Sequence, residues 1–479
     1  MGRIERLSLS DRSNLRIERR ETPAHVAGLC VVEAQPLLDA SGELDLATIR
    51  RRLERRLARA PELRRLVRRP PPLCGPALWV DDPSFSIDRH VRAIGVAPPG
   101  DEASMLDAAE RLLRPRLDRA RPLWELWFLT GLRGGRVGVL FKVHHAVVDG
   151  LAAIALMGSL LDLEPGAADP PPDGWHPEPP PSTLALLADS AHRRAVAAAS
   201  TARHPVRLAR AVASAIGDTA AGLRLLSAAP RSSLNALPGS RRRIGVAHLD
   251  LERARAAAHE HAARINDVVL AVVTGGVREL LAGRGELADG LELRVSVPAT
   301  LRRPGAAREL GNAVGVIVVS LPVGEPHPVT RLERIAAATA AAKAAQHPAY
   351  VQGLMGCMAA WGLAVPFARR QRMINLFVTN VPGPRDPLHL LGARIERIMP
   401  VTGLAGNVTL AFAALSYRGR LELVVDADAA TCADVDVLVA GMATAWRELA
   451  AEGPSDRTGT PGTTGTGGRS AAATRSERR

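Results

Sequence analysis

The chain reads Val137-Gly138-Val139-Leu140-Phe141-Lys142-Val143 and continues directly with His144-His145-Ala146-Val147-Val148-Asp149-Gly150. The first seven residues form a largely apolar run of strand length, so we expect a buried strand that ends at a pair of histidines. A strand that ends in an imidazole places a general base at a fixed point of a cleft. Histidine suits that task because its ordinary pKa lies near neutrality, at roughly 6.5. The stretch therefore predicts an enzyme that takes a proton from a hydroxyl or an amine.

The second histidine of the pair, His145, is the candidate base because it lies nearer the glycine turn. We expect supporting roles for His144, Asp149 and Gly150: Asp149 holds a nearby arginine or orients the turn, and Gly150 permits a backbone conformation that other residues resist. Two other interpretations stay open, a buried structural histidine pair and a metal site. A zinc site needs three or four donors, and no third donor stands at a suitable spacing. We therefore expect no bound metal.

The composition indicates a globular protein of two or three domains. The chain has 479 residues, of which 47% are hydrophobic and 3% aromatic, so aliphatic side chains must fill the core. Its four cysteines make no CxxC pair, which argues against a zinc or dithiol site. The net charge is +13, and Lys142 and Lys343 are the only lysines among 62 basic residues. A basic protein attracts anions, such as the phosphates of a nucleotide-bearing cofactor or lipid headgroups. Because no nucleic-acid-binding module is recognisable, we expect no nucleic-acid partner.

The sequence predicts a cytoplasmic location. The N-terminal residues 1–6 include several charges and lack the apolar stretch of a signal peptide. The longest uncharged apolar stretch, near residues 354–368, is shorter than the roughly 20 residues of a membrane span and contains Pro366. Basic and apolar patches still allow peripheral contact with the inner face of the plasma membrane or with a lipid droplet.

The order of the expected elements divides the chain into four parts. Residues 1–165 hold the histidine motif, and residues 166–240 form a proline-rich and then Ala-rich helical crossover. Residues 241–452 form a second half of similar size, and residues 453–479 are predicted to be a disordered tail. Both halves mix strands and helices, which favours two related α/β sandwiches. Helices are expected at 44–65, 104–114, 150–163, 251–263, 266–282, 329–346 and 434–451, and strands at 27–33, 126–129, 137–143, 245–251, 293–298, 314–321, 373–380, 408–415 and 421–426.

Other common catalytic arrangements are missing from the sequence. It contains no GxSxG elbow and no cysteine placed against a histidine by a known signature, which weighs against an acyl-enzyme intermediate. It also contains no P-loop and no GxGxxG after a strand, so phosphoryl transfer and nicotinamide chemistry lose support. What remains is a histidine base acting on two substrates that are bound together, that is, direct acyl transfer.

The histidine motif resembles the HHxxxDG motif of the coenzyme-A-dependent acyltransferase superfamily. That superfamily includes chloramphenicol acetyltransferases, peptide-synthetase condensation domains and the bacterial wax ester synthase/diacylglycerol acyltransferases. The flanking sequence looks like the last of these, in the family's order, over roughly residues 5–450. The matching elements are Pro122-Leu123-Trp124-Glu125 (PLWE), Asn266 to Ala271 (NDVVLA), Leu310-Gly311-Asn312 (LGN), Asn380-Val381-Pro382-Gly383-Pro384 (NVPGP), and Ser233-Leu234-Asn235 with Arg241-Arg242-Arg243. The chain departs from the family at Ala24-His25, where Met-His is usual.

The resemblance implies two chloramphenicol-acetyltransferase-like α/β sandwich domains with the active site in a tunnel at their interface. It implies transfer of a long-chain acyl group from acyl-CoA, a co-substrate, to diacylglycerol or a fatty alcohol, with no bound cofactor and with triacylglycerol or wax ester as product. The candidate substrate-binding residues carried over from it are Pro122, Leu123, Trp124, Glu125, Asn266, Asp267, Asn312 and Asn380. These residues also have ordinary structural interpretations, namely packing, helix capping and tight turns.

Two alternatives share the histidine motif. A condensation-domain-like or polyketide-ester acyltransferase would keep HHxxxDG but is expected to lack the PLWE and NVPGP elements. A non-catalytic lipid-binding or droplet-coating protein would keep the tunnel without needing His145. Turnover of labelled acyl-CoA separates these alternatives from the acyltransferase.

Overall fold

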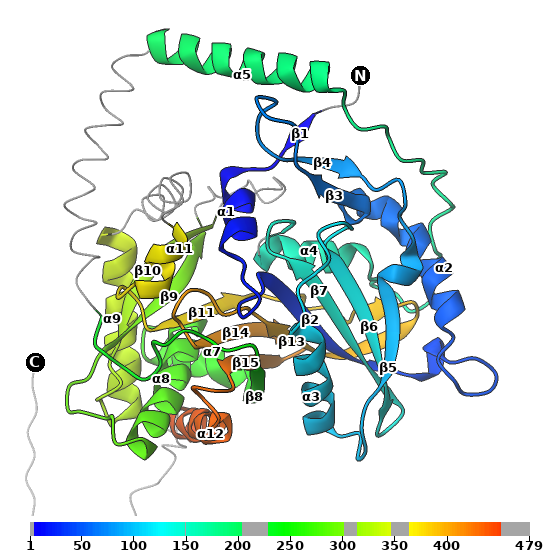
Figure 1. Cartoon of the computed structure of the whole chain (residues 1–479). Helices are drawn as coiled ribbons and strands as arrows, with labels where there is room; N and C mark the ends of the chain where they lie inside the picture. Colours follow the sequence, from blue (N-terminus) through cyan, green and yellow to red (C-terminus); the bar gives the residue numbers. More distant parts are fainter. Residues whose placement is uncertain (1–3, 149, 204–228, 301–313, 346–363, 452–479) are drawn as a thin grey trace, which may run out of the picture.

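The computed structural model describes residues 4–148, 150–203, 229–300, 314–345 and 364–451. Two six-stranded sheets, each with its own helices, form the body of the molecule, as Figure 1 shows. Both halves mix strands and helices, so the expected α/β class is confirmed. None of the helices in these ranges is long and apolar enough to cross a bilayer.

The N-terminal sheet places the histidine motif at the end of a central strand. Its strand order is β12-β13-β2-β7-β6-β5. The bounds are β2 His25–Glu33, β5 Val91–Gly95, β6 Trp124–Leu132, β7 Arg136–His144, β12 His389–Leu390 and β13 Ala393–Val401. Because β7 pairs with β2 on one side and β6 on the other, it is buried from Val137 onward. Helices α2 (Leu46–Arg56) and α4 (Gly150–Ser159) contribute to the core on one face, and α3 (Glu102–Leu113) packs on the other.

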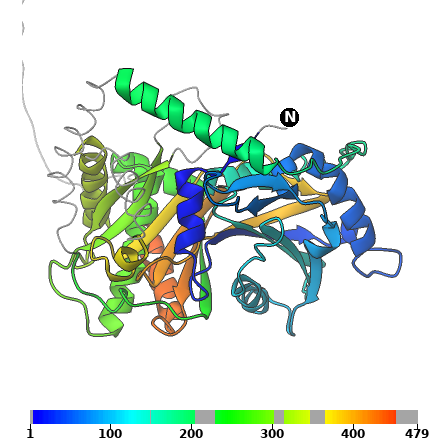
Figure 2. The ribbon, with the colours of Figure 1, turned by 45° about the horizontal axis from the view of Figure 1, so that its top comes forward.

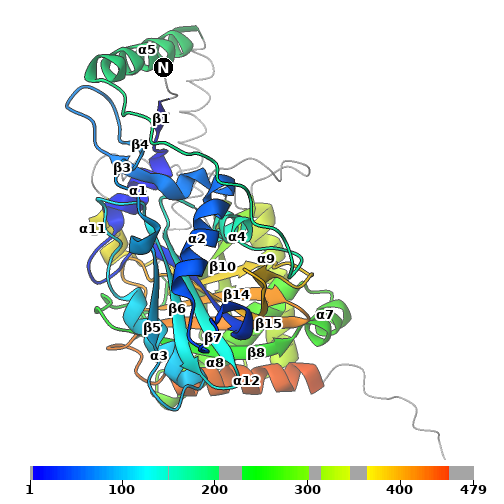
Figure 3. The same cartoon turned by 90° about the vertical axis from the view of Figure 1, so that its right-hand side faces the viewer.

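The C-terminal sheet has the order β10-β9-β11-β14-β15-β8. Its bounds are β8 Arg242–Asp250, β9 Leu293–Thr300, β10 Val314–Leu321, β11 Leu376–Val381, β14 Leu410–Tyr417 and β15 Arg420–Asp428. Four helices build the main core with this sheet: α7 Leu251–Glu260, α8 Ile265–Gly283, α9 Pro328–Ala345 and α12 Val435–Ala451. Figure 3 shows α12 at the end of the molecule opposite strand β1 (Glu5–Arg6).

The second half contributes two strands to the sheet of the first half. Strands β12 and β13 lie within residues 241–452, yet β13 pairs antiparallel with β2 and so completes the N-terminal sheet. Alternate residues of β13 also lie against β14 and β15, so this strand joins the two sheets. The division at residues 165 and 241 stays a prediction, and it did not include this contribution. The pairing of β13 with β2 brings the end of β13 next to the histidine motif.

The proline-rich part of the crossover is attached to the N-terminal half by ion pairs. Asp169 accepts hydrogen bonds from Arg52 and from Arg56, whose guanidinium is fully buried, and Asp173 pairs with Arg64. Helix α5 (Thr183–Arg203) then runs along the outside, against a small sheet made of β1 (Glu5–Arg6), β4 (Leu78–Asp81) and β3 (Arg65–Arg68) (Figure 2). The remaining predicted crossover residues 204–228 and the predicted tail 453–479 lie outside the described residues.

A network of charged side chains joins the two halves at the N-terminal end of α3. His248 of β8 lies 2.6 Å from Glu422 of β15 through Nδ1 and 3.6 Å from Glu102 of α3 through Nε2. Arg397 of β13 pairs with both carboxylates. The hydrogen bonds to Glu102 and Glu422 raise the pKa of His248 to about 9. The charged imidazolium therefore stabilises the contact between the halves at neutral pH.

The His248→Ala variant is expected to lower thermal stability at about pH 6 and to have little effect at about pH 10. The folded pKa is raised above the ordinary value, so the stabilisation is complete below pH 6.5 and is lost as the pH rises through 9. Because His248 is partly exposed, we expect only about 1 kcal/mol. The measurement is the difference in Tm between variant and wild type at both pH values, with the exposed His192→Ala as control. An equal difference at both pH values would contradict this assignment.

Candidate active site

The alternation of β7 separates the two histidines. Successive side chains of a strand point to opposite faces, so Phe141, Val143 and His145 project to one side, and Lys142 and His144 project to the other. Phe141, Val143 and His145 line a cavity of about 860 Å³. His144 and Lys142 have fully buried side chains on the face that α3 covers. Only His145 of the pair is partly exposed, as a base that must meet a substrate requires.

The cavity lies between the two halves and is mainly apolar. Its walls come from α1 (Leu9–Ile17), β2, β7 and α4 of the first half and from β11, the end of β13, β14 and α11 (Ala364–Arg370) of the second. The apolar lining includes Val26, Phe141, Val143, Phe377, Leu404 and Phe412. Polar side chains are few on the wall that β11 forms, and they include Thr379 and Asn380. This lining suits a long alkyl chain beside a small reacting centre.

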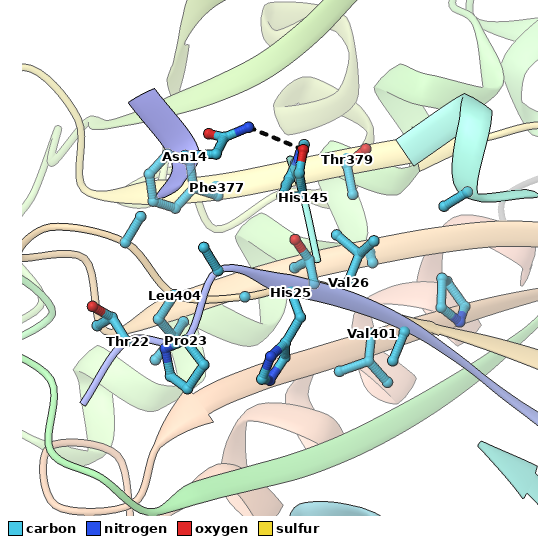
Figure 4. Close-up of a pocket in the computed structure, with 18 of the residues that line it drawn as sticks. Asn14, Thr22, Pro23, His25, Val26, His145, Phe377, Thr379, Val401 and Leu404 are labelled. Atoms are coloured by element: carbon cyan, nitrogen blue, oxygen red, sulfur yellow. Dashed lines mark hydrogen bonds between the residues drawn. The ribbon is translucent and has the colours of Figure 1, made fainter. Parts of the chain in front are cut away.

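The backbone of His145 is held by the segment around α1. The Asn14 amide donates to the His145 carbonyl at 3.1 Å, and the His145 N–H donates to the Ala24 carbonyl at 2.8 Å. Figure 4 shows Asn14 reaching His145, with Phe377 and Thr379 of β11 nearby and His25 pointing away. The two hydrogen bonds fix the main chain of His145 at the end of the strand. They therefore fix the point from which its imidazole extends into the cavity.

His144 is oriented by Glu18, a residue outside the histidine motif. The N–H of Ala146 donates to His144 Nδ1 at 2.9 Å, so a neutral ring must carry its proton on Nε2. That nitrogen lies 3.5 Å from Glu18, an ion-pair distance rather than a good hydrogen bond. Burial alone would raise the pKa of Glu18, but the nearby His144 and Arg119 outweigh burial and lower the pKa to about 2. Glu18 is therefore an anion that lies directly behind the motif.

The neighbouring His25 does not act on substrate in this arrangement. It stands opposite His144 in the pairing of β2 with β7. Its Nε2 lies 2.8 Å from the Leu113 carbonyl oxygen and must donate to it. Burial lowers the pKa of His25 to about 3, so the ring is neutral. Its role is to connect β2 to the end of α3.

The PLWE residues lie in the core beside the motif. The carbonyl of Leu123 accepts the N–H of His144 at 3.0 Å, and Trp124 donates through Nε1 to the Leu63 carbonyl. Glu125 accepts from Trp127 and lies 3.5 Å from the buried Lys142 ammonium. None of Pro122, Leu123, Trp124 and Glu125 is among the residues that line the 860 Å³ cavity. Their contacts in this structure are with the strand and the core, and their role in substrate binding stays a prediction.

Asn266 and Asp267 also do not line the cavity. They belong to the first turn of α8. Asp267 accepts the N–H of Arg264 at 2.9 Å, which is the capping interpretation of this element. Asn380 does line the cavity, from the end of β11. Gly150 begins α4, whereas Asp149 and Asn312 lie outside the described residues.

The titratable groups around the motif pair with one another. Within the described ranges, no three side chains of His, Cys, Asp or Glu are grouped so as to hold a metal ion. The nearby buried polar groups are instead used on each other: Glu18 on Arg119 and His144, and Lys142 on the carbonyls of Leu112 and Pro115. This arrangement can support proton transfer at His145, in an apolar cavity that both halves line.

Comparison with known proteins places this arrangement in a family. Residues 7–269 match the model of the wax ester synthase/diacylglycerol acyltransferase catalytic domain, and residues 310–450 match the WS/DGAT C-terminal domain. The chain is 33% identical over 384 residues to a probable diacylglycerol O-acyltransferase of Mycobacterium tuberculosis, tgs1, covering 79% of this chain and 82% of that protein. It is 30% identical over 438 residues to a second one, tgs2, covering 86% and 91%.

Solved structures agree with the fold. A wax ester synthase/diacylglycerol acyltransferase from Marinobacter aquaeolei VT8 superposes with a TM-score of 0.69 at 23% identity, over 94% of this chain and 99% of that one. The first condensation domain of the CDA synthetase gives a TM-score of 0.57 at 18% identity, over 94% and 97%. These likenesses confirm the two-domain arrangement of the superfamily. The two family models together cover most of the chain, and it therefore belongs to the wax ester synthase/diacylglycerol acyltransferase family.

Proposed function

We propose that this chain transfers a long-chain acyl group from acyl-CoA to the free hydroxyl of diacylglycerol, with His145 as general base. The observation that carries the proposal is the position of His145 at the end of β7, facing an apolar cavity of about 860 Å³ between the halves. Proteins named diacylglycerol O-acyltransferases are its relatives, which supports the same acceptor here. A fatty alcohol offers the same hydroxyl and chain, so wax ester synthesis is the second reaction we expect.

The reaction needs one proton to move twice. His145 takes the proton of the acceptor hydroxyl as its oxygen attacks the thioester carbonyl. The tetrahedral intermediate collapses, the carbon–sulfur bond breaks, and the imidazolium returns the proton to the thiolate of coenzyme A. General-base help is worth about 10²–10⁴ in rate, and holding both substrates in one cavity contributes further. The Asn14 and Ala24 hydrogen bonds hold the main chain of the base in place through both steps.

The lipid substrates suggest where the protein works. Helix α5 exposes Leu184, Leu187 and Val196 beside the exposed Arg193 and Arg194. Apolar and basic side chains on one outer helix favour the surface of an anionic bilayer or a lipid droplet. We therefore propose a cytoplasmic protein that binds peripherally to such a surface, where diacylglycerol is found.

The direct test incubates the full chain with radiolabelled palmitoyl-CoA and vesicles that contain diacylglycerol, hexadecanol or neither lipid, each with an aminoacyl-pantetheine present as a competing amine acceptor. We expect labelled triacylglycerol with the first, a smaller yield of wax ester with the second and only slow hydrolysis with the third. Co-sedimentation with the same vesicles checks peripheral binding. If the label enters neither lipid but moves to an amine acceptor carried by pantetheine, the condensation-like alternative replaces this proposal. If the chain binds lipid and transfers nothing, the lipid-binding alternative replaces it.

A further inference from the structure

A second hollow adjoins the catalytic cavity at the end of β11. Its volume is about 470 Å³, and it shares Asn380 and Pro382 with the catalytic cavity. The NVPGP segment therefore borders both spaces. The rest of its wall comes from the first turns of α7 and α8 and from the turn between β14 and β15. We call it the side pocket.

The side pocket carries a positive charge. Arg255, Arg385 and Arg418 line it, and Glu252 is the only carboxylate among its described lining residues. Glu252 pairs with Arg255. Within the described ranges, no hydrogen bond or ion pair is found for the guanidinium of Arg385 or Arg418, and both side chains are exposed. Two guanidinium groups thus stand ready for an anion from solution.

Two helix ends border the side pocket. Leu251 is the first residue of α7 and Ile265 the first of α8, and both line the side pocket. The N-terminal end of a helix carries a partial positive charge, but here Asp250 accepts the Arg253 N–H at the start of α7 and Asp267 accepts the Arg264 N–H at the start of α8. These carboxylates offset the charge of the helix ends, so the arginines supply the positive charge of the side pocket. Guanidinium groups bind phosphate through paired N–H donors. The chemistry of the side pocket is therefore that of a phosphate-binding site.

Tight backbone packing keeps the border between the two spaces in place. A Cβ on Gly383 would collide with the carbonyl oxygen of Ser416, so only glycine lets the loop lie this close to the end of β14. The Gly383 N–H also donates to the Ser416 hydroxyl at 3.2 Å. From Thr379 in the catalytic cavity to Arg385, an extended chain spans at most about 20 Å. An extended pantetheine arm covers such a distance.

We propose that the side pocket binds the phosphates of the coenzyme A moiety, and that the pantetheine arm passes Asn380 to bring the thioester to His145. This inference rests on the proposed function, because it assigns the place of the acyl donor. It also implies that the two substrates enter the cavity from different sides. The acyl donor enters beside the NVPGP segment, and the acceptor lipid reaches His145 by another route.

A second arginine-lined hollow competes for the same role. It holds Arg20, Arg114, Arg116 and Arg119, and it shares Glu18 and Glu21 with the catalytic cavity. Three carboxylates, those of Glu18, Glu21 and Asp118, also line it, and Arg119 is already paired with Glu18. Its net charge is therefore lower than that of the side pocket although it has more arginines. We assign the phosphates to the side pocket for this reason.

The test compares two double variants of the full chain. One removes the available arginines of the side pocket by Arg385→Ala and Arg418→Asn, since Asn tolerates the positive φ of 48° at position 418. The matched control removes two exposed arginines of the other hollow by Arg20→Ala and Arg116→Ala. Each is assayed with palmitoyl-CoA and with palmitoyl-N-acetylcysteamine, a donor that has the thioester but no phosphate.

We expect the side-pocket variant to raise KM for palmitoyl-CoA by roughly 10- to 100-fold at an unchanged kcat, since each lost charge-assisted hydrogen bond costs about tenfold. Its turnover of the phosphate-free donor should equal that of wild type. The control variant should behave as wild type with both donors. Three results would overturn the assignment: a KM effect in the control variant alone, an equal loss with both donors, or a loss of vesicle binding with an unchanged KM, which would point to lipid headgroups.

Calorimetry of coenzyme A binding separates this inference from the proposed function. The acceptor lipid is absent from that measurement. If wild type binds coenzyme A, the side-pocket variant does not, and no triacylglycerol forms in the vesicle assay, the pocket stands and the proposed acceptor fails. If triacylglycerol forms and the variant binds coenzyme A as wild type does, the function stands and the pocket fails.

Discussion

The His145→Ala variant is expected to lose about 10²–10⁴ of kcat for acyl transfer, because it removes the one imidazole of the motif that faces the cavity. The side chain is partly exposed, and its backbone bonds to Asn14 and Ala24 do not depend on the ring. The fold should therefore survive, and Tm should change by little. The measurement is initial rate with labelled palmitoyl-CoA and diacylglycerol, together with Tm.

The His145→Gln variant keeps much of the side-chain volume and should lose as much activity. KM for the acyl donor should stay near the wild-type value in both variants, since neither removes a contact to the coenzyme. A variant that keeps more than a tenth of the wild-type kcat would mean that another group removes the proton. A lipid-binding protein without activity would show no difference between the three forms.

The Glu18→Gln variant is expected to have the second largest effect. The change leaves His144 and Arg119 without the carboxylate that they share, in a site where Glu18 is buried. We expect a loss of about 2 kcal/mol in the free energy of unfolding, less than the 3–5 kcal/mol typical of a broken buried pair, because Arg119 keeps contact with water. A small displacement of the motif should also lower kcat by about 10- to 100-fold without the loss of a reacting group.

The pH dependence distinguishes this role from general damage. The pKa of Glu18 is lowered to about 2, so its stabilisation is complete above the ordinary value of 4.5 and is lost as the pH falls towards 2. The difference in Tm between wild type and Glu18→Gln should therefore shrink from pH 6 to pH 3. Glu21→Gln, an exposed carboxylate that lines the same cavity, is the matched control and should change neither Tm nor kcat much. A pH-independent difference would contradict the assigned ion pair.

The regular elements were largely predictable from their patterns. The expected strand 137–143 and helix 329–346 appear as β7 Arg136–His144 and α9 Pro328–Ala345. A buried strand is marked by a continuous apolar run, and a helix that packs on a sheet is marked by apolar residues at helical spacing. The expected helix 44–65 is shorter, since α2 ends at Arg56, one 3₁₀ turn follows at Leu57–Arg59 and a second begins at Pro61. Strand β13 was not predicted. It contains Arg394, Glu396, Arg397 and Pro400 among its apolar residues, so its sequence resembles a loop.

The site was predictable only where its chemistry lies within one motif. The position of His145 at a strand end followed from seven consecutive residues. Glu18 and Asn14 act on the motif from more than a hundred residues away in sequence, and neither has a local pattern that signals this contact. The PLWE residues were expected at the substrate because they resemble a family element; in the structure they pack beside the motif and do not line the cavity, and their role in substrate binding stays a prediction. A sequence motif alone does not distinguish a residue that contacts the substrate from one that packs beside the catalytic motif, because that difference depends on the tertiary structure.

The pairing of β13 with the sheet of the first half has a consequence for synthesis of the protein. During translation β2, β7 and β6 leave the ribosome long before β13, so the edge of β2 has no partner until residue 401 has emerged. Unpaired strand edges in partly folded chains attract other strands and promote aggregation. The first half therefore cannot finish folding by itself, and expression of a fragment that stops at the crossover should yield insoluble material.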